Sequence, residues 1–94
     1  MIFKNKTLLL TGGSRGLGKK ICYEFAKRGA NIIFTYVRSS TEAKKSIKEL
    51  EKFGVNVISK KLNLNSNEDI NRFSNEIKKL NIKPDFLINN AASG

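Results

Sequence analysis

The chain has 94 residues, a net charge of +10 and 39% hydrophobic residues, which suits one small globular domain. Its apolar runs are far shorter than the ~20 residues of a membrane-spanning helix, and its first residues lack the apolar centre of a signal peptide. Because there is one cysteine and no histidine, an internal disulfide and a cysteine-built metal site are excluded. We therefore expect a cytoplasmic protein with no membrane partner and no bound metal.

Strand-like and helix-like segments alternate along the chain. Apolar and β-branched runs predict strands at residues 6–11, 31–37, 55–62 and 86–88. Three helices are predicted between the strands: one over 17–28, one capped by Ser40 or Thr41 and running to Phe53, and one capped by Ser66. This alternation predicts an α/β fold, a doubly wound parallel sheet in the order 3-2-1-4 with helices on both faces.

Residues 11–18, Thr-Gly-Gly-Ser-Arg-Gly-Leu-Gly, lie between an apolar strand and a helix. In that context a glycine-rich turn lets the backbone approach a pyrophosphate, and the unpaired N–H groups at the helix start face its charge. The spacing is Gly12-x-x-x-Gly16-x-Gly18 rather than the common G-x-G-x-x-G, so the prediction depends on the strand and helix around it. We predict a dinucleotide site; the alternative is a flexible loop without a ligand.

Arg38 follows the second predicted strand, 20 residues after Gly18. In NAD-preferring folds a carboxylate at about this place binds the ribose 2′-OH. Such a carboxylate would repel a 2′-phosphate by roughly 4 kcal/mol at ~4 Å, whereas a guanidinium binds phosphate with forked hydrogen bonds. Residues 31–41 contain no carboxylate. We therefore predict that NADP(H) is preferred over NAD(H), with Arg15 approaching from the glycine turn; the alternative is a charged residue that merely ends a strand.

Polar side chains also follow the third and fourth predicted strands. Asn63 could accept a hydrogen bond from an adenine amino group, although a turn-forming asparagine is an equal alternative. The run Asn89-Asn90-Ala91-Ala92 is small and polar. Small residues allow the backbone to approach a ribose, and the two asparagine side chains could tie neighbouring strands together.

These segments resemble those of a known family. Residues 11–18 are similar to the TGxxxGxG cofactor motif of the short-chain dehydrogenase/reductase family, and residues 89–92 resemble its NNAG segment. The resemblance spans the chain and implies one partial, Rossmann-like NAD(P)-binding domain over residues 1–94. The nearest likeness is to bacterial 3-oxoacyl- or NADPH-dependent enoyl-acyl-carrier-protein reductases. It implies hydride transfer to a carbonyl or enoyl group of an acyl thioester in fatty acid biosynthesis, by an enzyme that is a dimer or tetramer.

The resemblance also implies roles for single residues. The phosphates would be contacted by Gly12, Ser14, Arg15, Gly16, Leu17 and Gly18. Arg38 and Ser39 would hold the 2′-phosphate, Asn63 and Leu64 would flank the adenine, and Asn90 and Ala91 would line the ribose. Thr11 would pin the turn to the end of the fourth strand. Two positions depart from the family pattern: Asn63 replaces Asp but keeps an acceptor oxygen, and Ala92 replaces Gly, which favours the enoyl-reductase-like subgroup.

No catalytic residue is predicted in these 94 residues, because the family's serine and Tyr-x-x-x-Lys follow the NNAG segment. Tyr23 and Lys27 have that spacing, but Tyr23 is predicted to face water. The predicted inward stripe of the first helix is Leu17, Ile21 and Phe25, with Cys22 beside it as a small core residue. We expect a truncated sheet whose fourth strand has a bare edge, in a chain that is marginally stable, associates through that edge or is a fragment.

Two other functions are compatible with the sequence. One is a non-catalytic nucleotide-binding or interaction module. The other is nucleic-acid binding through the basic surface. The lysines are spread along the chain and no nucleic-acid-binding motif is present, so a solvated surface without a nucleic-acid partner is favoured.

Overall fold

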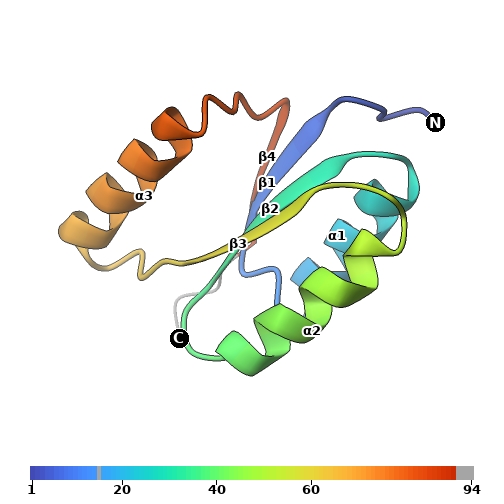
Figure 1. Cartoon of the computed structure of the whole chain (residues 1–94). Helices are drawn as coiled ribbons and strands as arrows, with labels where there is room; N and C mark the ends of the chain where they lie inside the picture. Colours follow the sequence, from blue (N-terminus) through green and yellow to red (C-terminus); the bar gives the residue numbers. More distant parts are fainter. Residues whose placement is uncertain (15, 91–94) are drawn as a thin grey trace.

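The computed structural model describes residues 1–14 and 16–90, in which strands and helices alternate (Figure 1). The elements are β1 (Thr7–Thr11), α1 (Gly16–Lys27), β2 (Asn31–Tyr36), α2 (Ser40–Glu51), β3 (Val57–Lys61), α3 (Asn67–Lys79) and β4 (Phe86–Asn89). All neighbouring strands pair in parallel, in the order β3-β2-β1-β4. The predicted α/β fold and strand order are therefore confirmed.

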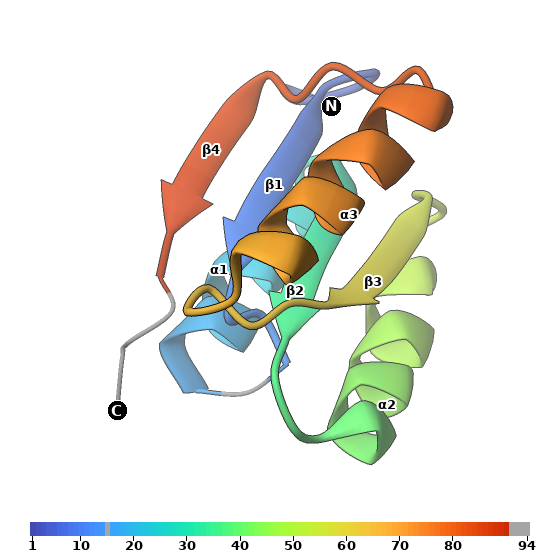
Figure 2. The same ribbon diagram turned by 90° about the vertical axis from the view of Figure 1, so that its left-hand side faces the viewer.

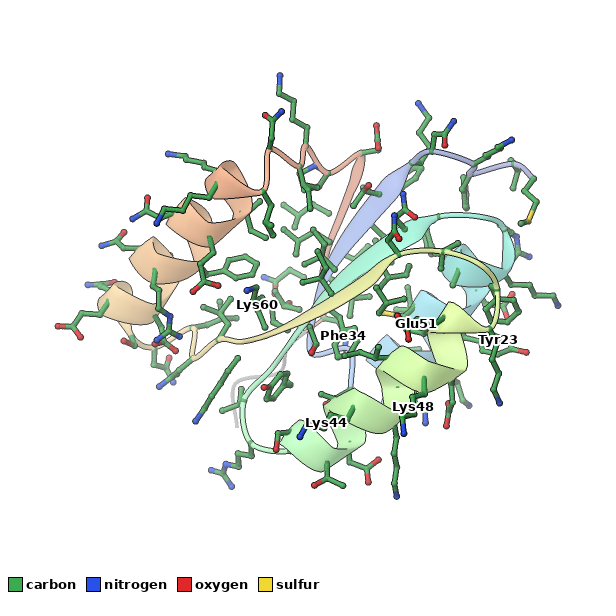
Figure 3. The ribbon with its side chains drawn as sticks, in the orientation of Figure 1. Tyr23, Phe34, Lys44, Lys48, Glu51 and Lys60 are labelled. Carbon is green, nitrogen blue, oxygen red and sulfur yellow. The ribbon has the colours of Figure 1, made fainter. Side chains whose placement is uncertain are left out.

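Helices α1 and α2 cover one face of the sheet and α3 covers the other (Figures 1 and 2). Most of the fully buried side chains gather between the sheet and the α1–α2 layer. Alternate residues of β1 and β2 point into this layer, with Leu8 beside Ile32 and Leu10 beside Phe34. Figure 3 shows Phe34 on this side of the sheet. The helices meet these strands mainly through small side chains, so they approach the sheet closely.

The inward face of α1 differs from the prediction by one residue. Leu17 is 66% exposed, whereas Gly18, Cys22 and Ala26 are buried. The buried residues recur every four positions, as predicted. A large side chain in place of Gly18, the first of them, would separate the helix from the turn after β1. The prediction for Leu17 was therefore wrong. Ile21 and Phe25 of the predicted stripe are partly buried and pack against the core, and the prediction that Cys22 is a core residue is confirmed.

Tyr23 lies on the exposed side of α1, as predicted, with 44% of its surface accessible. Its ring packs edge-on against Phe53, with centroids 4.9 Å apart. Figure 3 shows Tyr23 beside the end of α2, on the outer side of the helix layer. Tyr23 of the Tyr-x-x-x-Lys sequence in α1 thus contacts Phe53 and lies away from the carboxyl ends of the strands.

The face covered by α3 is more open than the face covered by α1 and α2. No residue of α3 is buried, and Leu87 of β4 is 71% exposed. Among the described residues β4 pairs only with β1, so its outer edge is bare, as predicted. Lys60 of β3 points toward α3 and pairs with Glu76 at 3.0 Å (Figure 3). Association through the bare edge stays a prediction.

The helix caps differ in part from those predicted. Ser39 caps α2, where Ser40 or Thr41 was predicted, because its hydroxyl oxygen accepts a hydrogen bond from the Glu42 N–H at 3.2 Å. Ser66 caps α3 as predicted, accepting from the Asp69 N–H at 3.2 Å. Strand β3 is shorter than predicted, since only Val57–Lys61 pairs with β2.

Two further features concern the described residues only. None of their helices is long and apolar enough to cross a lipid bilayer. No group of three or more His, Cys, Asp and Glu side chains among them could hold a metal ion.

The buried thiol provides a test of the core. Burial raises the pKa of Cys22 from 9.0 to about 12, so the native thiol stays protonated at pH 8 to 9. We expect it to react with a disulfide reagent only as fast as the chain unfolds, and at once in guanidinium chloride. Because the native pKa is raised, the stabilisation from the protonated thiol is complete below pH 9 and is lost as pH rises toward 12. Immediate native-state labelling would contradict this packing.

Candidate functional site

The carboxyl ends of the four parallel strands lie along one edge of the sheet (Figure 2). The segments that leave this edge contain most of the residues for which a role was predicted: residues 12–14 after β1, 37–39 after β2, 62–66 after β3 and Asn90 after β4. In open parallel sheets, ligands bind at this edge where neighbouring strands lead to opposite faces. Here β1 leads to α1 on one face, whereas its neighbour β4 is reached from β3 through α3 on the other face, so the strand order reverses between β1 and β4.

The end of β1 is fastened to the end of β4 by side-chain hydrogen bonds. The Thr11 hydroxyl donates to Asn89 Oδ1 at 2.9 Å and accepts from the Asn90 N–H at 3.0 Å. Asn90 Nδ2 then donates to the Gly12 carbonyl at 3.1 Å. The predicted pinning of the turn by Thr11, and the tying of neighbouring strands by both asparagines, are therefore confirmed.

The first two glycines hold the turn onto β2. The N–H groups of Gly12 and Gly13 donate to the Thr35 carbonyl at 3.1 and 3.0 Å. Gly12 has a φ of 77°, which only glycine adopts at little cost. A Cβ on Gly13 would lie 2.5 Å from Phe34 Cβ. The amides of Gly12 and Gly13 are thus engaged with β2, and these glycines shape the loop.

The amide groups at the start of α1 are differently placed. Among the described residues, none accepts a hydrogen bond from the N–H groups of Ser14, Leu17 or Gly18. Gly16 has a φ of 61°, and a Cβ there would meet nothing within 4 Å. These N–H groups carry the positive end of the helix dipole, so an anion is the ligand that they favour.

Gly18 makes the close contact between α1 and the turn. A Cβ on Gly18 would overlap the Gly12 carbonyl oxygen and lie 2.6 Å from Asn90 Nδ2. Glycine is required here because the backbone itself fills the space. The third glycine of the motif is therefore explained by the packing of helix, turn and β4.

One contact of the loop was not predicted from the sequence. The hydroxyl of Ser46, on α2, donates to the Ser14 carbonyl at 3.2 Å, and both residues are buried. The signal that could have suggested it is a small polar residue on the inward face of α2, between Ala43 and Leu50. Its partner, 32 residues earlier, could not be read from the pattern.

Arg38 is exposed at the bend between β2 and α2, next to the cap residue Ser39. Among the described residues no carboxylate forms an ion pair with the Arg38 guanidinium. Ser39 is occupied in part, because its oxygen accepts from the Glu42 N–H. The two residues therefore offer a free cation and a hydroxyl group beside a helix N-terminus.

Asn63 forms a turn after β3. Its Oδ1 accepts from the Asn65 N–H at 3.0 Å, and its own N–H donates to Asp69 Oδ2 at 2.8 Å. The turn-forming alternative thus describes the structure, while contact with adenine stays a prediction. Leu64 is exposed in the same turn. Of the other predicted residues, Arg15 and Ala91 lie outside the described residues.

Comparisons with known proteins identify the family of the chain. The family profile described as short chain dehydrogenase matches residues 6–94. The chain belongs to the short-chain dehydrogenase/reductase family. It is 34% identical to the short-chain dehydrogenase/reductase homolog YusS of Bacillus subtilis over 88 residues, which is 94% of this chain and 81% of that protein.

Other members of the short-chain dehydrogenase/reductase family are much longer. The chain is 34% identical to L-rhamnose 1-dehydrogenase (NADP(+)) of Thermoplasma acidophilum, covering 95% of this chain and 35% of the relative. It is 30% identical to 3-oxoacyl-[acyl-carrier-protein] reductase FabG of Staphylococcus epidermidis, covering 93% and 36%. A solved short chain dehydrogenase of Burkholderia cenocepacia in complex with NADP is 27% identical, with a TM-score of 0.89, and covers 99% of this chain and 38% of its own.

The glycine contact can be tested with a matched pair of variants. We expect Gly18→Ala to lower the free energy of unfolding by about 1–3 kcal/mol and to abolish dinucleotide binding, because the added methyl displaces α1 from the turn. Gly54→Ala is the control: its φ of 77° makes alanine costly by about 1–2 kcal/mol, but its Cβ would meet nothing within 4 Å. Calorimetry with NADPH should show unchanged affinity for Gly54→Ala. Equal affinities for both variants would contradict the role of Gly18.

Proposed function

We propose that this chain is the dinucleotide-binding part of an NADP(H)-dependent oxidoreductase, with NADP(H) preferred over NAD(H). The observation that carries the preference is Arg38, an exposed guanidinium at the end of β2 without a carboxylate partner among the described residues. The N–H groups of Leu17 and Gly18, which have no acceptor within residues 1–14 and 16–90, support binding of the pyrophosphate. The NADP complex of the Burkholderia relative supports the same cofactor.

The residues fit the pyrophosphate, the 2′-phosphate, the adenine and the ribose of such a cofactor. Ser14, Gly16, Leu17 and Gly18 would hold the pyrophosphate, together with Arg15, and Gly12 would shape the turn. Arg38 and Ser39 would hold the 2′-phosphate by charge and hydrogen bonding. Asn63 and Leu64 would flank the adenine, and Asn90 and Ala91 would line the ribose. We assign these roles to one cytoplasmic domain over residues 1–94, without nucleic-acid or membrane partners.

The proposed parent reaction is hydride transfer to a carbonyl or enoyl group, with an acyl thioester as substrate. The bound cofactor supplies the hydride, and this chain contributes binding and orientation of its adenosine and phosphate parts. The likeness to FabG and the Asn-Asn-Ala-Ala-Ser run support an acyl-carrier-protein-linked substrate in fatty acid biosynthesis. The likeness to L-rhamnose 1-dehydrogenase instead favours a sugar as the substrate. A dimer or tetramer is the proposed assembly of the full-length enzyme.

Cofactor preference is tested by titrating NADPH and NADH against the chain. We expect tighter binding of NADPH, and we expect Arg38→Ala to weaken NADPH binding by roughly 10- to 100-fold with little change for NADH. Arg28→Ala is the control, since Arg28 pairs with Glu24 near the end of α1, far from this edge. Equal or tighter binding of NADH by the unaltered chain would reject the preference.

A second candidate function is a non-catalytic nucleotide-binding module. It is favoured by YusS, a relative of which this chain covers 81%, and by the position of Tyr23 away from the strand ends. Absorbance at 340 nm with NADPH and an acyl thioester shows whether these 94 residues have catalytic activity of their own. We expect binding of NADPH without its oxidation by these 94 residues, because the catalytic serine and Tyr-x-x-x-Lys of the family follow the NNAG segment. Oxidation dependent on the acyl substrate would contradict this expectation.

A further inference from the structure

Helix α2 connects the two ends of the proposed site. Its cap, Ser39, directly follows Arg38, and two helical turns later Ser46 reaches the glycine turn. The Ser46 side chain is 0% exposed. A hydroxyl buried so completely is costly unless it is hydrogen-bonded, and the acceptor here is the Ser14 carbonyl at 3.2 Å. One helix thus presents the cation at its start and fixes the loop from its middle.

The Ser46 bond holds the loop that leads into α1. The Ser14 carbonyl lies two residues before Gly16, whose φ of 61° is left-handed and not that of an α-helix. The first N–H groups of a helix have no partner within it, and within residues 1–14 and 16–90 nothing accepts from the Gly18 N–H. The Ser46 bond therefore fixes the loop that precedes these N–H groups.

We infer that Ser46 is a positioning residue of the dinucleotide site. By holding the Ser14 carbonyl against α2, it fixes the loop that leads into α1 and thereby the place of the Leu17 and Gly18 N–H groups. This inference rests on the proposed dinucleotide-binding function. Because NADP(H) and NAD(H) share the pyrophosphate, Ser46 acts on both alike, whereas Arg38 acts on the 2′-phosphate alone.

The test is Ser46→Ala in the 94-residue chain, which removes the hydrogen bond to the Ser14 carbonyl. We expect the affinities for NADPH and NADH to fall by the same factor, roughly three- to tenfold, in isothermal titration calorimetry. Without ligand, the Leu17 and Gly18 amide signals should shift in NMR spectra, because the loop before them is no longer held to α2. Ser46→Thr keeps the hydroxyl and should retain both the wild-type affinity and the wild-type Gly18 signal.

Ala43→Gly is the matched control, because Ala43 is buried in the same helix and makes no contact through a hydroxyl. It should lower Tm while leaving both affinities within about twofold of wild type. If circular dichroism shows Ser46→Ala to be unfolded, Ser46→Cys replaces it, since a thiol keeps the size but is a weak donor. The same loss of affinity is then expected.

Three outcomes would overturn the role of Ser46: wild-type affinity in the variant that lacks the hydroxyl, an equal loss in Ala43→Gly, or a loss confined to NADPH. The failure of the underlying function looks different. If the unaltered chain binds neither nucleotide, the proposed function is rejected and the positioning role with it. If the chain binds and Ser46→Ala binds equally well, only the positioning role is rejected.

Discussion

The contact between the start of α1 and the turn after β1 constrains the whole carboxyl edge of the sheet. Gly18 lies so near the Gly12 carbonyl that a Cβ would overlap it, and the same carbonyl accepts from Asn90 Nδ2. Helix, turn and β4 therefore meet at one peptide group. Asn90 is 78 residues beyond Gly12, so this point joins distant segments of the chain. Because there is no space for a side chain at Gly18, the start of α1 meets the turn through backbone contact.

The amides of the glycine-rich segment divide into two sets. Those of Gly12 and Gly13 continue the pairing of β1 with β2 through the Thr35 carbonyl, so they stabilise the turn. Those of Leu17 and Gly18 have no acceptor among the described residues. A loop whose amides were all free would be poorly ordered, and one whose amides were all bonded could not bind a phosphate. The unusual glycine spacing is understandable from this division, because the first glycines face β2 and the last faces the turn.

Most of the fold could be predicted because its signals are local. Apolar runs, helix caps and alternation of elements indicated the strand order, and Thr11 was correctly expected to fasten the turn. Leu17 was wrongly placed on the inward face of α1 because stripes beginning at Leu17 and at Gly18 have the same period, whereas Ile21 and Phe25 do pack against the core. Hydrophobicity favours Leu17, whereas the close approach to the sheet requires Gly18, Cys22 and Ala26. The Ser46 bond to Ser14 depends on tertiary packing, which no local pattern describes.

The less buried face of the sheet is the one covered by α3, whereas the glycine turn, Arg38 and Ser46 belong to elements packed on the other face. The buried cluster packs β1 and β2 against α1 and α2, and these elements also carry the glycine turn, Arg38 and Ser46. Phe86 and Ile88 of β4 pack against the buried cluster. Side chains alternate in direction along a strand, so the exposed Leu87 between them faces the α3 side, as does its Cα partner Leu9 in β1. Protein that packs against Leu87 would therefore approach from the α3 side and leave the start of α1 accessible. The loop geometry thus derives from the well-packed half of the domain, and it does not require the α3 face to be covered.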